Sequence, residues 1–211
     1  MMIVAGAADC QHMTTSDARI AKWNARYTAG GDVPDAPPLQ LLAAAVAGVR
    51  PGRALDLACG SGRHALWLAA RGWRVAAVDG AATALDLLLA RAELTGCSDR
   101  VEPYVADLEA EPPEFTVAEQ AYDLIVDCHF LHRPLFPAIR NGVRPGGLFV
   151  AALHIPAGDG NRGHGYLLQP GELAAMVSEW GWTALHSAEH DSVAAEDHGL
   201  GVAEIVARRP R

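Results

Sequence analysis

The residues best placed to do chemistry are a carboxylate and a glycine turn that follow one short apolar run. Asp56 lies within the apolar stretch 54–58, which the Gly-Ser-Gly segment 60–62 interrupts. From Ala65 onward the apolar residues recur at helical spacing. This pattern predicts a buried strand, a glycine turn and a helix. Glycines at such a turn let the backbone pass close to a ligand, and the N–H groups of the helix point toward it.

Two classes of ligand fit this turn. The spacing of Gly60, Gly62 and Ala65 matches the G-x-G-x-x-G/A fingerprint of dinucleotide-binding proteins. Asp56, however, lies four residues before Gly60. A carboxylate in that position suits a cation better than a pyrophosphate. The turn therefore leaves both a dinucleotide and a cationic ligand open, and Asp56 favours the second.

A second carboxylate, Asp79, ends the apolar run 74–78 and lies 17 residues after Gly62. A carboxylate at the end of the second strand can accept two hydrogen bonds from a ribose 2′,3′-diol. This spacing predicts an adenosine ribose beside Asp79 and Gly80, and it counts against a 2′-phosphorylated ribose. Asp79 could at the same time cap the following helix.

Alternating strands and helices must position these side chains. Strands are expected at 54–58, 74–78, 101–105, 121–127, 148–153, 183–190 and 200–207. Helices are expected over 39–49, from 65, over 81–92 and 135–143, and from 170 to 180. Pro103 marks the third strand as an edge strand, and 144–147 reads as a turn. The alternation predicts a single α/β domain with a doubly wound seven-stranded sheet, mostly parallel, with helices on both faces and an antiparallel C-terminal hairpin.

The N-terminal 38 residues are expected to form a flexible segment with one short helix, and residues 39–211 form the core. Ser16 is the expected N-cap of that helix. Ile20, Trp23 and Tyr27 then share one helical face. Trp23 and Tyr27 either pack in the core or close over the ligand.

Taken in order, several motifs resemble those of the class I S-adenosylmethionine (SAM)-dependent methyltransferases. They are D-L-A-C-G-S-G at 56–62, Asp79, Asp107, Y-D-L-I-V-D at 122–127 and R-P-G-G at 144–147. The segments 23–27, 63–69 and 132–136 are most similar to the tellurite-resistance-like and thiopurine-like small-molecule branch. The resemblance runs from about Trp23 to Ala207. It departs at His64, where the branch often has Asn, and at 154–156, where it often has Glu-Thr-Phe.

The resemblance implies that a methyl group passes from SAM to a small-molecule acceptor by in-line displacement, leaving S-adenosylhomocysteine. It implies that Asp107 accepts a hydrogen bond from the adenine amino group and that the Leu108 backbone contacts the ring. An Asx turn is the alternative role for Asp107. Trp23 and Tyr27 would form the lid. The full set of expected cofactor-binding residues is Trp23, Tyr27, Asp56, Ala58, Gly60, Gly62, Asp79, Gly80, Asp107, Leu108, Asp127 and Cys128.

Histidines supply the candidates for a general base, which is needed only if the acceptor must lose a proton. His129 and His132 follow the fourth strand, at the sheet edge where ligands of α/β proteins bind, and we select them as catalytic candidates. His154 and His164 are further candidates, and any of the four could be a polar surface residue. A thiolate or tellurite-type acceptor would need no base. An anionic acceptor would favour an arginine clamp from Arg63, Arg133 or Arg162.

The charge and composition of the chain limit the classes of partner that it is expected to bind. The formal net charge is -8 and the pI is about 5.5, which disfavours nucleic acid. No apolar run reaches membrane-spanning length, and the first ten residues lack the positive region of a signal peptide. The four cysteines have neither paired nor zinc-ligand spacing. We therefore expect a cytoplasmic monomer or homodimer that acts on a small molecule, without a metal, a membrane or a nucleic acid.

Two alternatives stay open. An NAD-linked oxidoreductase would use the same glycine turn. Asp56, Asp107 and the lack of a recognisable catalytic Ser/Tyr/Lys set count against it, since Lys22 is the only lysine. A non-catalytic SAM-binding protein would account for the altered residues after the fifth strand.

Overall fold

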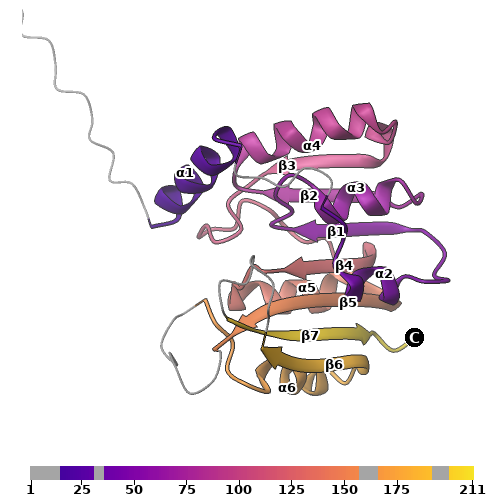
Figure 1. Cartoon of the computed structure of the whole chain (residues 1–211). Helices are drawn as coiled ribbons and strands as arrows, with labels where there is room; N and C mark the ends of the chain where they lie inside the picture. The colour runs from indigo at the N-terminus through magenta and orange to yellow at the C-terminus, as the bar shows by residue number, and fades with distance from the viewer. Residues whose placement is uncertain (1–14, 31–35, 157–165, 192–199) are drawn as a thin grey trace, which may run out of the picture.

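The computed structural model describes residues 15–30, 36–156, 166–191 and 200–211 (Figure 1). Its strands are β1 (Arg53–Leu57), β2 (Arg74–Asp79), β3 (Val101–Val105), β4 (Tyr122–Cys128), β5 (Val143–Ile155), β6 (Thr183–Asp191) and β7 (Gly201–Arg208). Its helices are α1 (Thr15–Thr28), α2 (Gln40–Ala45), α3 (Arg63–Ala69), α4 (Ala82–Leu94), α5 (Phe136–Gly142) and α6 (Glu172–Glu179). Two short 3-10 turns are η1 (Ser98–Arg100) and η2 (Arg133–Leu135).

The strands form one seven-stranded sheet in the order β3-β2-β1-β4-β5-β7-β6. Strands β1 to β5 pair in parallel, whereas β7 runs antiparallel to both β5 and β6. In Figure 1 the arrowheads of β1 and β4 point toward the side where α1 lies, and β7 points the other way. The predicted sheet with its antiparallel C-terminal hairpin is confirmed, and β3, which contains Pro103, is an edge strand as expected.

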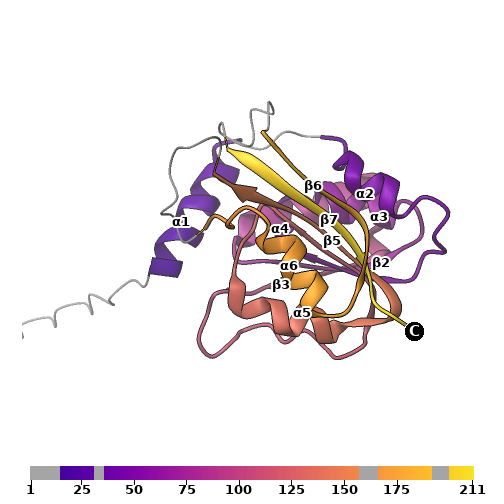
Figure 2. The same ribbon diagram turned by 90° about the horizontal axis from the view of Figure 1, so that it is seen from below.

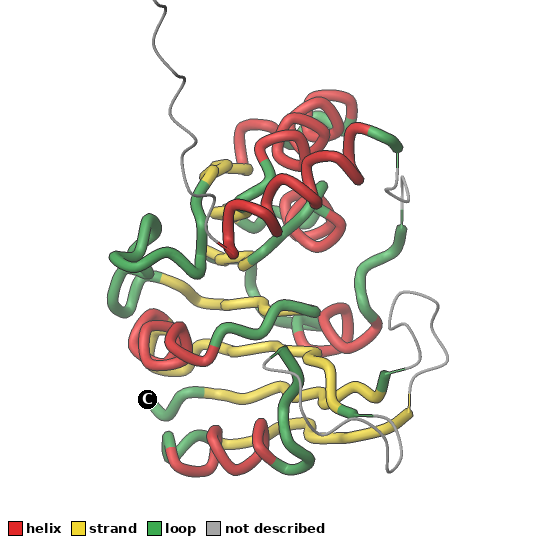
Figure 3. The backbone as a smooth tube through the Cα atoms, turned by 90° about the vertical axis from the view of Figure 1, so that its left-hand side faces the viewer, coloured by secondary structure: helices red, strands yellow, loops and turns green. Residues whose placement is uncertain are grey.

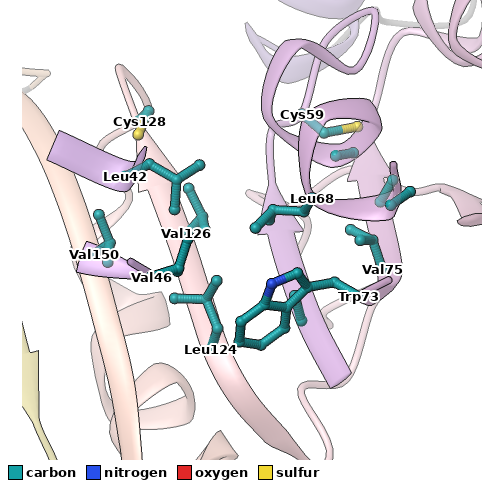
Figure 4. Packing of buried hydrophobic residues seen from close by; sticks show 14 of the residues in the cluster. Leu42, Val46, Cys59, Leu68, Trp73, Val75, Leu124, Val126, Cys128 and Val150 are labelled. Carbon is teal, nitrogen blue, oxygen red and sulfur yellow. The ribbon is translucent and has the colours of Figure 1, made fainter. Parts of the chain in front are cut away.

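Helices cover both faces of the sheet (Figure 2). Apolar side chains of α2, α3 and α4 form a core with one face of the sheet, and those of α5 and α6 form a second core on the other face. In the first core, Leu68 and Trp73 face Leu124 and Val126, and Leu42 of α2 packs beside them (Figure 4). Because β1, β2 and β4 are covered on both sides, their ends are held firmly where the site forms.

Three local expectations need correction. Residues 144–147 are not a separate turn but an irregularity inside β5, where the pairing jumps from Tyr122↔Val143 to Leu124↔Leu148. Ser16 is not the N-cap of α1, because the helix already includes Thr15. The helix expected over 39–49 is shorter, since α2 ends at Ala45. Among the described residues, no helix is long and apolar enough to cross a membrane.

Candidate functional site

The glycine turn between β1 and α3 directs its amides inward. Ala58, Gly60 and Gly62 all have positive φ, at 49°, 55° and 90°. The N–H of Cys59 donates to Val78 O at 3.0 Å, and the N–H of Gly60 donates to Asp79 Oδ2 at 2.8 Å. Gly62 N–H donates back to Cys59 O at 3.1 Å. These amides are tied to the protein itself, unlike the outward-facing N–H groups that hold a pyrophosphate.

The glycines of the turn are also required by what surrounds them. A Cβ on Gly62 would lie 2.7 Å from Leu88 Cδ1, so this glycine lets α4 pack against the turn. Arg91 of α4 reinforces that contact by donating to Ser61 Oγ at 2.8 Å. Together these contacts fix the turn beside the end of β2.

Asp56 and Asp127 are buried at neighbouring positions in β1 and β4, each only 1% exposed. Burial, assisted by the nearby Asp79 charge, raises the pKa of Asp56 to about 7, although a hydrogen bond from the Ala65 backbone opposes this shift. Burial and the Asp56 charge raise the pKa of Asp127. Asp56 Oδ2 and Asp127 Oδ1 have no hydrogen-bond partner among the described residues. Asp56 therefore lies beneath the turn, where it binds an amide at the start of α3.

A cavity of about 350 Å³ lies beside the turn, lined by α1 and by residues that follow β1, β2, β3 and β4. Figure 3 shows α1 near the edge of the sheet at which these parallel strands end. Cofactor sites typically measure about 300–1,000 Å³. The cavity is lined by Ser16, Arg19, Ile20, Trp23, Tyr27, Ala58, Asp79, Gly80, Ala81, Asp107, Leu108, Glu109, Cys128, His129, Phe130, Leu131, His154 and Tyr166.

Most of the predicted cofactor residues meet at this cavity. Eight of them line it, namely Trp23, Tyr27, Ala58, Asp79, Gly80, Asp107, Leu108 and Cys128. The other four, Asp56, Gly60, Gly62 and Asp127, are absent from its lining. Gly60 nevertheless adjoins the site, because a Cβ on it would lie 2.5 Å from Tyr27 Oη.

Asp79 and Asp107 are both held by hydrogen bonds. Asp79 Oδ1 accepts from the Ala81 N–H at 2.8 Å, and burial raises the pKa of this carboxyl. Asp107 Oδ1 accepts from the Glu109 N–H at 2.9 Å, which is the Asx turn considered above, and Oδ2 accepts from Ser16 Oγ. Each carboxylate oxygen has a second lone pair, so these bonds leave both side chains able to bind a ligand in the cavity.

Helix α1 crosses the cavity and is attached to its rim. Arg19 pairs with Glu109 at 2.5 Å, and Asn24 Oδ1 accepts from the Thr83 N–H at 3.0 Å. Ile20 lies against Gly80, where a Cβ would come within 2.9 Å of its side chain. Trp23 remains 46% exposed, so it is not a core residue. Polar contacts of Arg19 and Asn24 and the packing of Ile20 on Gly80 together hold the helix over the cavity.

The two catalytic candidates occupy different surroundings. His129 lines the cavity, and its Nδ1 lies 3.2 Å from Nε2 of His154. His132 does not line it, and its Nδ1 lies 3.9 Å from Glu109 Oε1. His164 and Arg162 lie outside the described residues.

The expected arginine clamps are engaged elsewhere. The guanidinium of Arg133 donates to both carboxylate oxygens of Glu172, at 2.6 and 2.8 Å, and to Leu167 O at 2.9 Å. Arg63 donates to Pro37 O at 2.5 Å. Neither side chain lines the cavity. His64, at the position that departs from the resembling branch, is buried with its pKa lowered to about 3 by burial and then by the Arg63 charge.

Sequence reasoning missed several lining residues. Ser16 and Arg19 precede Trp23 by seven and four residues, so extending the expected face of Ile20, Trp23 and Tyr27 toward the N-terminus would have found them. Glu109 follows Asp107 by two residues within its Asx turn. His154 was expected only as a further base candidate, and its place beside His129 required knowledge that β4 and β5 are neighbours. No group of three His, Cys, Asp or Glu within the described parts of the chain is arranged to hold a metal ion.

Comparison with known proteins identifies the domain. Residues 54–147 match the family described as "Methyltransferase domain". A search of curated protein sequences found no match. This domain match agrees with the methyltransferase class and the SAM cofactor predicted from the sequence.

Solved structures share the fold at low sequence identity. A 1,6-didemethyltoxoflavin-N1-methyltransferase from Burkholderia thailandensis, solved with 1,6-didemethyltoxoflavin and S-adenosylhomocysteine, is 23% identical with a TM-score of 0.69, covering 99% of this chain and 94% of its own. TehB from Haemophilus influenzae is 21% identical with a TM-score of 0.65 over 80% of this chain, which spans only 61% of TehB. The [4+2]-cyclase SpnF is 16% identical with a TM-score of 0.68, covering 93% of this chain and 96% of its own. Residues 54–147 therefore match a methyltransferase domain, within a chain that has the class I SAM-dependent methyltransferase fold.

Proposed function

We propose that this protein transfers a methyl group from SAM to a small-molecule acceptor. The observation that carries the proposal is the Asp79 carboxylate, which accepts the Gly60 amide at 2.8 Å and also lines the cavity. This contact joins the glycine turn to the carboxylate expected to bind the ribose diol. The cavity beside it is covered by α1, which carries the expected lid residues Trp23 and Tyr27.

The inward-facing amides of the turn support SAM over NAD. Cys59, Gly60 and Gly62 donate to protein acceptors, and Asp56 accepts the Ala65 amide beneath the helix start. Asp56 thereby occupies an amide at the start of the helix that would otherwise be available to a pyrophosphate. The cavity lining adds Asp107 and Glu109, whose charges would disfavour a dinucleotide phosphate further, whereas Asp79 could bind the ribose of either cofactor.

The chain's own residues would bind and orient the reactants. Asp79 would accept hydrogen bonds from the ribose diol, Asp107 would accept from the adenine amino group, and Leu108 would contact the ring. Trp23 and Tyr27 would close over the site and exclude water. SAM supplies an electrophilic methyl group on a sulfonium when bound. The protein then accelerates the displacement chiefly by positioning the acceptor in line with that group.

The acceptor is proposed to be a small molecule. The Burkholderia thailandensis enzyme was solved with the small molecule 1,6-didemethyltoxoflavin. SpnF has the same fold and is a cyclase, so the fold alone does not specify methyl transfer. We further propose that residues 1–211 form one domain, with 1–38 as the N-terminal segment that includes the lid helix. The protein would act in the cytoplasm as a monomer or homodimer, independently of nucleic acid and membranes.

A crystal of the protein soaked with S-adenosylhomocysteine tests this function. The proposal expects the ribose at Asp79, the adenine at Asp107 and open space beside the sulfur, bounded by His129 and Phe130. A side chain filling the space beside the sulfur would support the non-catalytic alternative. Absence of S-adenosylhomocysteine from the cavity at saturating concentration would overturn the assignment of the cofactor site.

A further inference from the structure

Two imidazoles form a close pair in the wall of the cavity. His129 Nδ1 lies 3.2 Å from His154 Nε2, and the ring centroids are 4.9 Å apart. Both side chains line the cavity. His129 also adopts φ 62°, a left-handed conformation that costs energy in most non-glycine residues. Strained backbone of this kind is concentrated at functional sites.

The sheet holds the pair in place. The His129 N–H donates to Ala152 O at 2.8 Å, directly beyond the register pair Cys128↔Ala152 of β4 and β5. His154 lies two residues further along β5, opposite Val202 of β7. The two rings therefore come from adjacent strands that are fixed on either side. They meet at the strand ends, beside Ala58 and Cys128 of the cofactor wall.

The positions of the hydrogens on the two rings determine which proton transfers the pair can carry out. In a pair of neutral imidazoles, one ring donates its inner N–H to the inner nitrogen of the other. The outer nitrogen of the donating ring then carries a lone pair, whichever ring donates. Protonation of that nitrogen makes the bond between the rings charge-assisted and therefore stronger. A second proton would leave both inner nitrogens carrying hydrogens, so it would break the bond between the rings.

The surrounding charges favour a cationic pair and disfavour an anionic acceptor. The cavity is lined by three carboxylates, Asp79 at the end of β2 and Asp107 and Glu109 after β3, against one guanidinium, Arg19 of α1. Arg19 is itself paired with Glu109. The other titratable groups facing the pair are His64 of α3, whose pKa is lowered in part by His129, and Tyr27, Cys128 and Tyr166 in the cavity wall.

The remaining wall is largely aromatic and apolar. Trp23, Phe130, Leu131 and Tyr166 line the same cavity as the two histidines. Such surfaces bind flat, uncharged rings with little desolvation cost.

We propose that His129 and His154 act together as the general base for an uncharged ring acceptor that carries an N–H or O–H group. This inference rests on the proposed methyl transfer. The acceptor's lone pair forms the new bond to the methyl carbon, and the carbon–sulfur bond breaks with its electron pair left on sulfur. The acceptor's N–H or O–H proton passes to the outer nitrogen of the histidine pair. One proton is then shared between the two rings until it leaves to water.

The pairing is tested first without any acceptor. Full-length protein labelled with ¹⁵N-histidine is titrated from pH 5 to 9, with and without S-adenosylhomocysteine, and the variants H129F and H154F assign the signals. The proposal expects both rings to shift together in the first protonation step. In H154F the remaining His129 should titrate in one step, with an apparent pKa lower by about one unit, a tenfold loss of proton affinity.

The matched control is H186F, which makes the same substitution at a half-exposed histidine of β6 whose Nε2 lies 3.2 Å from Glu204. It should leave the His129 signals unchanged. Independent titration of the two rings, with no change of either pKa when the other ring is replaced, would overturn the pair. Failure of S-adenosylhomocysteine to bind would count against the proposed function alone, because the titration is also read without it.

The base role is tested with two acceptors of the same shape, 2-naphthol and 2-naphthalenethiol, each supplied with SAM. Naphthol is neutral and must lose its proton, whereas the thiol is largely ionised at pH 8. In H154F, kcat for naphthol should fall by about 10²-fold or more with little change in KM, as expected for loss of a general base. Methylation of the thiol should fall far less, because its thiolate needs no base. Undiminished methylation of naphthol by H154F would overturn the base role.

Discussion

The Tyr27 hydroxyl lies directly over Gly60, so that a Cβ on that glycine would come within 2.5 Å of Tyr27 Oη. This contact joins the expected lid helix to the glycine turn of the sheet. Two further residues of α1 contact the other loops: Ile20 lies against Gly80, and Ser16 donates a hydrogen bond to Asp107. One face of α1 therefore touches each of the three loops expected to bind the cofactor.

The first prediction concerns this contact. Gly60→Ala should weaken binding of S-adenosylhomocysteine, because the new methyl group displaces Tyr27 and because φ 55° costs about 1–2 kcal/mol for alanine. Adding Tyr27→Phe to Gly60→Ala should restore part of the affinity, since the clash is with the hydroxyl. Calorimetric affinities of the single and double variants measure the coupling. Strictly additive losses would show that the two residues act separately.

The second prediction concerns the ribose. Asp79→Ala should weaken S-adenosylhomocysteine binding by roughly 1.5–3 kcal/mol, the range for hydrogen bonds to a charged group. The control is Asp123→Ala. Asp123 likewise accepts a backbone N–H, from Arg53 at 2.8 Å, but it lies near the start of β4, whereas the cavity lies at the end of that strand. The control should lower stability and leave affinity intact. An affinity change under about 0.5 kcal/mol in Asp79→Ala would rule out the ribose assignment.

The sequence predicted these two positions because local patterns determine them. The apolar run 74–78 followed by Asp79, and the turn at 60–62, each lie within one βα unit. Tyr27 was expected to form part of the lid, but its contact with Gly60 was not predicted. That contact depends on how α1 docks onto α4.

Positions set by long-range packing were harder to predict. Asp127 was expected to bind the cofactor, but it is buried and does not line the cavity, whereas the next residue, Cys128, does. Strand alternation separates the two, and sequence alone does not say which face is open. The pairing of His129 with His154 depends on β4 and β5 being neighbours and on their register, information that neither strand carries by itself. For the same reason, the docking of Arg133 onto Glu172 could not be foreseen.

The third prediction is a pH dependence of stability. Burial raises the pKa of Asp56 from 3.8 to about 7, so between these values the folded protein holds a proton that the unfolded chain releases. The stability from this proton is fully present below pH 4 and is lost as pH rises through 7. Between pH 5 and 8, the unfolding free energy of wild type should therefore fall by on the order of 2–3 kcal/mol more than that of Asp56→Asn.

Denaturant unfolding at the two pH values measures this difference. Asp86→Asn makes the same change at an exposed position on α4 and should follow the wild type. If the unfolding free energies of wild type and Asp56→Asn changed equally between pH 5 and pH 8, the raised pKa of Asp56 would be contradicted.

The fourth prediction separates structure from substrate binding at Arg133. Its bidentate pair with Glu172 is partly exposed, with 40% and 28% of the two side chains accessible, so solvent screens the interaction. Arg133→Ala should lower stability by only about 1 kcal/mol and leave S-adenosylhomocysteine affinity unchanged. Glu172→Ala should do the same. Loss of activity toward an anionic acceptor in Arg133→Ala, but not in Glu172→Ala, would instead make this arginine a substrate clamp.

Calorimetric titration of the full-length protein with S-adenosylhomocysteine and, separately, with NADH measures whether this fold binds SAM. We expect S-adenosylhomocysteine to bind, Asp79→Ala to weaken that binding, and NADH to give no heat of binding. Binding of NADH alone would contradict this expectation, because the glycine turn would then have to hold a pyrophosphate despite its inward-facing amides and the buried Asp56 beneath it.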